Sequence, residues 1–273
     1  MIKFFRNIRQ NMIKQNKVSN YLLYAIGEIV LVVIGILIAL QVNNWNIEKN
    51  KSKLEKVLLA QVKDEILEVY KDLESDLTFL NQGNRSYLNV LNYIQKNVTY
   101  ADSMCFDFYW LAEDEYIYPE EAVYSKIKEE GLDIIKNDSI KYLLQDLYEG
   151  FYPRISRDHP FKPDISESFS DYYQKYFKPN YDISLKFKLK YKADKYNSGT
   201  LQFPYEYDND GMKRLETVGY IPLDFEALKK DTNFQILMRQ TREYRNYKRD
   251  YYSNTKKIIE QILTLIDKEL AND

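Results

Sequence analysis

The sequence has almost none of the residues from which metal and redox sites are usually built. Among its 273 residues there is one cysteine, Cys105, and one histidine, His159. A single cysteine excludes an intrachain disulfide and a cysteine-rich metal site. The apolar neighbours of Cys105 predict a buried and inert thiol, and the prolines and charges beside His159 predict a loop. We therefore expect no metal site and no cofactor.

Catalytic and nucleic-acid signatures are missing as well. The sequence contains no phosphate-binding loop, dinucleotide fingerprint, zinc-binding helix or nucleophile elbow. Its 39 basic residues are balanced by 41 acidic ones, so the overall charge favours no nucleic-acid partner. We predict no catalytic residue and no nucleic-acid partner.

Glycine and proline are scarce, with 8 and 7 residues. Because these two residues mark most turns and loops, their scarcity favours long helices. The predicted fold class is mainly α.

One long apolar run stands out in this sequence. Residues 21–42 contain 16 aliphatic residues in 22, and as a helix they would extend about 33 Å, enough to cross a hydrocarbon core of roughly 30 Å. Tyr21, Tyr24 and Trp45 are placed where aromatic residues meet the two membrane interfaces. The following "ALQVNNWN" offers no small-x-small cleavage site. The run predicts an uncleaved transmembrane helix whose first partner is the lipid bilayer.

The residues before this run predict its orientation. Residues 1–20 contain no acidic residue and five basic ones: Lys3, Arg6, Arg9, Lys14 and Lys17. Such a segment is typical of a cytoplasmic tail. Lysines also follow the span, but long domains are translocated largely regardless of their charge. The tail is therefore expected in the cytoplasm and the remaining chain on the other side.

The apolar run contains a carboxylate, Glu28, roughly 5 Å from the predicted midplane by helical rise. A charge at this depth costs about 2.5–3 kcal/mol, so such residues usually face protein or have a function. Val32, Gly35 and Ala39 share its helix face, and Gly35-xxx-Ala39 is a pair of small residues that lets another helix approach closely. We name Glu28, Val32, Gly35 and Ala39 the span stripe and predict that it contacts a protein partner or a second copy. The alternative is a carboxyl that hydrogen-bonds within its own helix or reaches toward the interface.

The segments "MIKFFRNIRQ" and "YLLYAIGEIVLVVIGILIALQVNNWN" resemble the start of a Bacteroidetes family of uncharacterised single-pass inner-membrane proteins. The stretch from Ala122 to Gly150 and the C-terminal "QILMRQTREYRNYKRDYYSNTKKIIEQILTLIDKEL" resemble its middle and end, whereas residues 151–230 do not. The resemblance implies a Gram-negative inner membrane, a cytoplasmic N-terminus and a helical periplasmic domain. It implies no activity.

Two further segments show helical periodicity. In residues 46–98 a 3–4 seam begins at Leu59, contains an irregular step at Leu77, and passes Gly83, where a kink or break is expected. In residues 231–270 a second seam is predicted at Leu237, Thr241, Tyr244, Lys248, Tyr251, Thr255, Ile258, Ile262 and Leu265. A coiled-coil-like antiparallel pair is favoured by the length of these patterns, although a globular amphipathic helix gives the same signal.

Residues 99–230 are predicted to form a mixed helical head. Helix caps are expected at Asn137 or Asp138, at Asp164, and at Asp231 or Thr232. A β-hairpin is predicted near residues 183–207, where lysines alternate with apolar residues. These lysines are Lys186, Lys188, Lys190 and Lys192. They suit an anionic lipid, a polysaccharide or an acidic partner, or simply a solvated face that blocks edge pairing.

The patterns together predict a membrane-anchored extracytoplasmic protein with a structural or interaction role, which binds another envelope component. The alternative is a carboxylate-bearing single-span subunit of an ion-driven inner-membrane complex, by analogy of topology alone.

Overall fold

The computed structural model describes residues 18–156, 164–182, 184–192, 198–203, 206–209, 212–215 and 219–271. The protein is mainly helical, as predicted. Its helices are α2 (Val18–Gln95), α3 (Cys105–Ala112), α4 (Ala122–Glu130), α5 (Asp138–Gln145), α6 (Tyr152–Ile155), α7 (Ile165–Tyr176), α8 (Phe225–Lys230) and α9 (Thr232–Ala271). Two 3₁₀ turns, η1 (Asp102–Met104) and η2 (Leu132–Ile134), and a π-helical turn, η3 (Asp146–Phe151), connect some of them.

The chain divides into two compact units, Met1–Lys56 and Val57–Asp273. The predicted caps of the second unit are present. Asn137 caps α5, Asp164 caps α7, and Asp231 accepts hydrogen bonds from the first backbone amides of α9. His159 and the structure of the basic tail up to Lys17 lie outside the described residues.

Helix α2 runs without interruption from Val18 to Gln95. No proline occurs in this stretch, and proline is the residue that most strongly ends a helix. The helix does not break at Gly83 but continues through it. The helix ends where Asn97 adopts a positive φ of 49°, a left-handed conformation that asparagine tolerates at a helix C-terminus.

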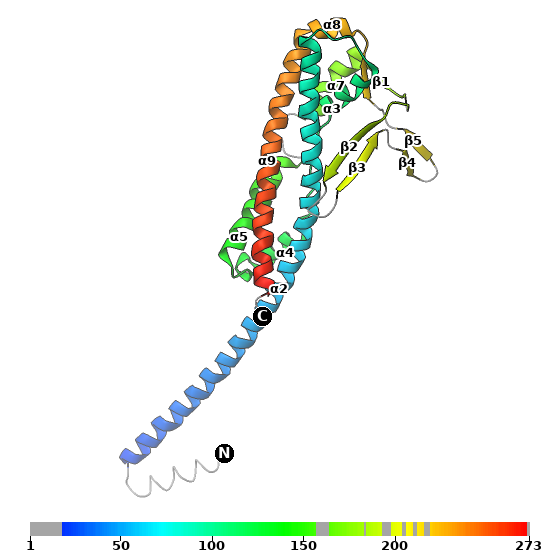
Figure 1. The fold of residues 1–273 in the computed structure, drawn as a ribbon. Helices are drawn as coiled ribbons and strands as arrows, with labels where there is room; N and C mark the ends of the chain where they lie inside the picture. Colours follow the sequence, from blue (N-terminus) through cyan, green and yellow to red (C-terminus); the bar gives the residue numbers. More distant parts are fainter. Residues whose placement is uncertain are drawn as a thin grey trace. The chain divides into compact units, whose positions relative to one another are not determined.

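In the second unit, α9 lies antiparallel beside the second part of α2 (Figure 1). Among the side-chain pairs that join the two helices are four polar pairs in which each forward step along α2 is matched by an equal backward step along α9. The pairs are Lys63–Asp267, Tyr70–Glu260, Glu74–Lys256 and Asn84–Asn246. The helix pair therefore keeps one register along its length.

The buried seam of α2 is more regular than the sequence suggests. Its buried residues alternate in steps of three and four, with no irregular step: Leu59, Val62, Ile66, Val69, Leu73, Asp76, Leu80, Gly83, Tyr87 and Val90. The predicted irregularity at Leu77 was wrong, because Leu77 is only half-buried and Asp76 occupies the buried position. The buried position is therefore held by a polar residue, Asp76, which a search for apolar residues does not find.

The predicted seam of α9 was displaced for the same reason. Of its members only Thr241, Thr255 and Ile262 are buried. At five of the other six positions the buried residue is the next one along the chain: Met238, Arg245, Tyr252, Ile259 and Ile266. The prediction placed Tyr244 in the buried seam because a buried arginine is not expected. This choice shifted the neighbouring predicted positions by one residue.

The two ends of the helix pair are covered by different elements (Figure 1). At one end α3, α7, α8 and β1 (Phe177–Asn180) enclose an aromatic core with the ends of α2 and α9. At the other end α5 and α6 contact α9. The core thus extends along the whole second unit instead of filling one central volume.

Three antiparallel strand pairs are present in the described residues: β1 with β6 (Gly219–Pro222), β2 (Phe187–Lys192) with β3 (Ser198–Phe203), and β4 (Glu206–Asn209) with β5 (Met212–Leu215). The predicted hairpin is the pair β2–β3, in register from Phe187↔Phe203 to Lys192↔Ser198. The turn at residues 193–197, Pro204, and the side chain of Lys192 lie outside the described residues.

Candidate functional site

The span stripe lies in the first unit on one face of α2. Val32 is 55 % exposed, and a Cβ built on Gly35 would meet no atom within 4 Å. Glu28 is half-buried and Ala39 is exposed. The helix therefore brings the four predicted residues onto one face, and the small residues leave that face open to a close approach.

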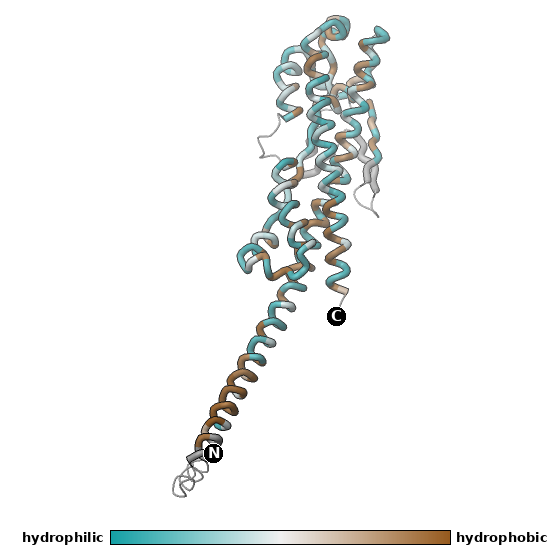
Figure 2. Tube along the Cα trace, turned by 90° about the vertical axis from the view of Figure 1, so that its left-hand side faces the viewer, coloured by the Kyte–Doolittle hydropathy of each residue, from teal (hydrophilic) through white to brown (hydrophobic). Residues whose placement is uncertain are grey.

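The rest of this segment is apolar on all sides. Every large apolar side chain described between Leu22 and Val42 is 47–72 % exposed, and the most apolar window has a mean hydropathy of 2.6. Figure 2 shows the apolar residues as a continuous stretch in this part of α2. A helix that is apolar all round suits a membrane rather than water. The chain thus has one helix, within its described residues, that is long and apolar enough to cross a membrane.

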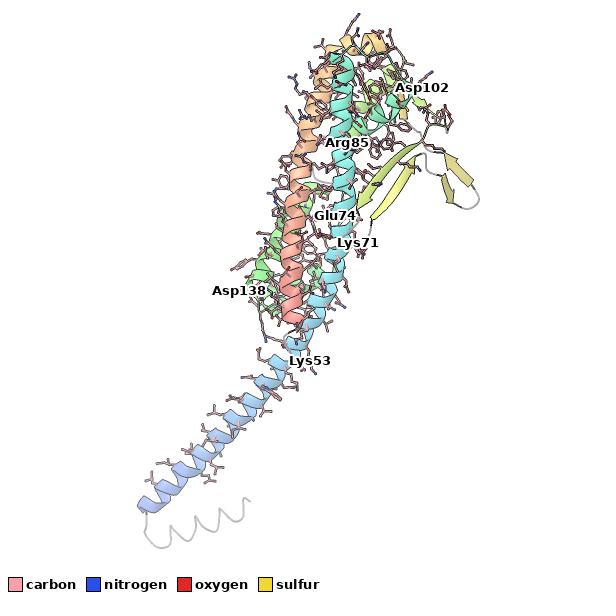
Figure 3. All side chains as sticks on the ribbon, in the orientation of Figure 1. Lys53, Lys71, Glu74, Arg85, Asp102 and Asp138 are labelled. Carbon is pink, nitrogen blue, oxygen red and sulfur yellow. The ribbon has the colours of Figure 1, made fainter. Side chains whose placement is uncertain are left out.

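A groove of about 820 Å³ lies in the second unit between α2 and β2. Its α2 wall is a polar stripe at helical spacing, formed by Thr78, Asn81, Gln82, Arg85 and Asn89. In Figure 3, Arg85 is labelled on α2 next to the β2–β3 hairpin. The opposite wall is formed by residues 186–190.

The groove is predominantly cationic. Arg85 lines it from α2, Lys188 and Lys190 line it from β2, and Lys186 lines it from the residue directly before β2. Its one acidic residue, Asp107, is already engaged, because its two carboxylate oxygens accept hydrogen bonds from Asn89 (3.0 Å) and Tyr93 (2.6 Å). The groove therefore suits an anionic ligand.

A second polar cluster lies between α2 and α9. It consists of Asp76, Gly83, Arg245, Lys248 and Tyr252. The guanidinium of Arg245 is fully buried and donates to the backbone oxygens of Leu111 (2.8 Å) and Glu113 (3.2 Å). Tyr252 donates to the backbone oxygen of Glu115 at 3.1 Å.

Gly83 makes room for this arginine. A Cβ at position 83 would lie 2.5 Å from Nε of Arg245 and 3.0 Å from the backbone oxygen of Trp110. The glycine that sequence reasoning assigned to a kink is therefore a close-packing position. Its absent side chain lets α2 approach the buried guanidinium.

Carboxylates of the acidic segment after α3 complete this cluster. Asp114 accepts from Lys248 at 2.7 Å and from the hydroxyl of Tyr116 at 2.9 Å. Burial raises the pKa of Asp76 to about 7, and burial together with the charge of Asp76 raises the pKa of Glu115 to about 8. These groups bind the irregular segment to the helix pair, which is a structural role.

Nucleophilic and metal chemistry find no support in the described residues. Cys105 is buried, as predicted, and burial raises the pKa of its thiol to about 11. No group of three or more potential metal-binding side chains lies together in the described part of the chain.

No family model, curated protein or solved structure matches the chain. The function must therefore be argued from its geometry.

Sequence reasoning identified the lysines of β2 but missed their opposite wall. The signal was present, since Thr78, Asn81, Gln82, Arg85 and Asn89 repeat at helical spacing on α2. In the sequence, such a polar stripe looks the same as a helix face that is exposed to solvent. Only the position of β2 beside it turns the stripe into a wall.

Proposed function

We propose that this protein is a membrane-anchored structural and interaction protein with a single transmembrane helix. The apolar part of α2 would cross the membrane and the unit Val57–Asp273 would lie in the periplasm. The observation that carries the proposal is the all-round exposure of large apolar side chains between Leu22 and Val42. In water such a surface would drive aggregation, whereas in lipid it is stable.

The orientation follows from the basic residues at positions 1–20, and the inner membrane from the resemblance to the Bacteroidetes family. Alkaline phosphatase fused after Leu270 should be active in cells, because this reporter folds only outside the cytoplasm. A fluorescent cytoplasmic reporter at the same position should be dark. The opposite pair of results would overturn the orientation.

We further propose that α2 and α9 form a coiled-coil-like stalk. The equal and opposite steps of the four cross-helix pairs support it. Cysteines placed at Asn84 and Asn246 should crosslink within one chain. Crosslinks between identical positions of two chains, without the intrachain product, would indicate a parallel oligomer instead.

The span stripe is the proposed contact with another transmembrane helix, from a protein partner or a second copy. Small residues permit close packing of helix backbones in lipid, and Gly35 has open space on its side. Gly35→Leu should abolish association measured by crosslinking in native membranes. Gly27→Leu is the matched control, because it adds the same side chain about 80° away from Gly35 around the helix.

Substitutions at Glu28 distinguish a packing role from a role in proton coupling. If Glu28 packs by hydrogen bonding, Glu28→Gln should retain association. If the protein is an ion-driven subunit, the same variant should assemble normally and fail in the cell. If Glu28→Leu and Gly35→Leu both leave association and phenotype unchanged, the span stripe is not a contact surface.

A further inference from the structure

The groove of the second unit follows the edge of a strand. Five consecutive residues, from Lys186 to Lys190, line it. Successive side chains of a strand point to opposite faces, so a groove lined by consecutive residues runs along the edge and not over one face. The other edge of β2 is paired with β3, and no described strand pairs with the groove side. Backbone donors and acceptors of β2 therefore face the groove.

The dimensions of the groove suit one further strand. Its wall on α2 runs from Thr78 to Asn89, about 16 Å by helical rise, and its wall on β2 is roughly 13 Å long. An added strand occupies about 4.8 Å by 10 Å by 3.3 Å per residue, or about 160 Å³. The volume of about 820 Å³ is therefore filled by about five residues in extended conformation.

The positive charges of the groove favour an added strand that carries acidic side chains. Lys186, Lys188 and Lys190 are exposed and repeat every second residue, so they share one side of the strand. Within the described part of the chain, neither they nor Arg85 form an ion pair. Side chains of an added strand would lie about 5 Å from those of β2 on the same side. Acidic residues at alternate positions would thus each meet a lysine.

We propose that this groove binds an extended acidic peptide segment, which adds to β2 as a third strand and places acidic side chains opposite Lys186, Lys188 and Lys190. Lysines on an edge strand discourage pairing with uncharged strands, and the same charges favour an acidic one. This is a second binding surface, separate from the span stripe, and it stands whether or not the stripe has a partner.

An anionic saccharide fits the groove less well. Sugar sites usually offer an open aromatic face, but Phe106 and Phe187 pack on each other with ring centroids 5.2 Å apart. Phe187 also lies 6.0 Å from the ring of Trp110. The rings at the floor of the groove are therefore occupied by the protein itself.

The test uses the full-length protein in mild detergent and a fluorescein-labelled peptide, Thr-Glu-Thr-Glu-Thr-Glu-Thr. Fluorescence anisotropy should show saturable binding that weakens as salt increases, because the contacts are charged. Hydrogen exchange should slow at the backbone amides of residues 186–190. A peptide with alternate amides N-methylated keeps every charge but cannot pair along the strand, and it should bind at least tenfold more weakly.

The protein variants separate the groove from general attraction between charges. Replacement of Lys186, Lys188 and Lys190 by glutamine should weaken binding at least tenfold. The matched control replaces Lys126, Lys175 and Lys257, which are also exposed, and should change affinity less than twofold. Both triple variants should keep the melting temperature of the parent, since all six side chains are exposed.

Three outcomes would overturn the proposal. They are an absence of saturable binding up to about 1 mM peptide, equal binding of the N-methylated peptide, and equal loss in the two triple variants. Tighter binding of a hyaluronate hexasaccharide than of the peptide would also overturn it, in favour of an anionic sugar.

Discussion

Two stretches of the same helix treat apolar side chains in opposite ways. Between Leu22 and Val42 of α2 the large apolar side chains that the structure describes are all exposed. Between Leu59 and Val90 the buried ones form one stripe and are at most 6 % exposed, whereas Leu88 lies outside this stripe and is 54 % exposed. The two stretches differ in composition as well as in pattern, because residues 22–42 contain one charged residue, Glu28, whereas charged residues recur throughout residues 59–90. An apolar surface on all sides requires lipid, whereas an apolar stripe requires only a partner helix.

The largest effect should come from charges placed in the exposed apolar stretch. Leu31→Arg combined with Ile34→Arg should prevent membrane insertion, because each arginine costs roughly 2.5–3.5 kcal/mol near the centre of a span. Carbonate extraction of cell membranes measures the outcome.

The control for this variant uses Val57→Arg with Leu88→Arg, two apolar residues of the second unit that are 50 % and 54 % exposed. These changes should leave the protein in the membrane fraction. Equal retention of both double variants would mean that the stretch around Leu31 does not meet lipid.

Truncation within the buried stripe should have the next largest effect. Leu73 is 0 % exposed, and Leu73→Ala should lower the free energy of unfolding by about 2–5 kcal/mol through lost burial and a cavity. Leu37→Ala, at a residue that is 57 % exposed, should leave unfolding of the helix pair unchanged. Chemical unfolding in mild detergent compares them, and similar losses would contradict the distinction between the two stretches.

Two glycines of α2 give a smaller but sharper contrast. Gly83→Ala should lower the free energy of unfolding by about 1–2 kcal/mol, because overpacking at Arg245 outweighs the gain in helix propensity. Gly35→Ala meets open space and should cause no loss. A neutral Gly83→Ala would show that Arg245 can move away at little cost.

The smallest effect concerns pH. The raised pKa values of Asp76 and Glu115, about 7 and about 8, lie above their unfolded values of about 4. The folded state therefore binds more protons between these limits, and the free energy of unfolding should fall as pH rises through this window. Asp76→Asn removes one titration and should reduce the loss between pH 6 and pH 8 by about 1 kcal/mol. Identical losses in chemical unfolding at the two pH values would show that Asp76 does not titrate there.

The sequence was a good guide where chemistry and burial agree. Three features were predicted correctly because each follows from a local rule. They are the long apolar run of α2, the caps at Asn137 and Asp164, and the alternation in β2. The existence of a long C-terminal helix was legible for the same reason.

Sequence reasoning failed where a polar residue is buried. Arg245 occupies a core position where the backbone oxygens of Leu111 and Glu113 accept hydrogen bonds from its Nη2 and Gly83 gives it space. None of these partners is near it in sequence. The groove was missed for a similar reason, since its two walls are separated by about a hundred residues of chain and only the fold brings them together.

The contact of Gly83 with Arg245 also restricts how the chain can change in length. One residue inserted into α2 before Gly83 would turn the following part of the helix by about 100° relative to the preceding part. Either Gly83 would leave Arg245 or the apolar stripe before it would leave α9. An insertion of seven residues restores the stripe, but it must be matched by seven in α9 to keep glycine opposite arginine. Changes in length within this pair should therefore occur as whole heptads, in both helices together.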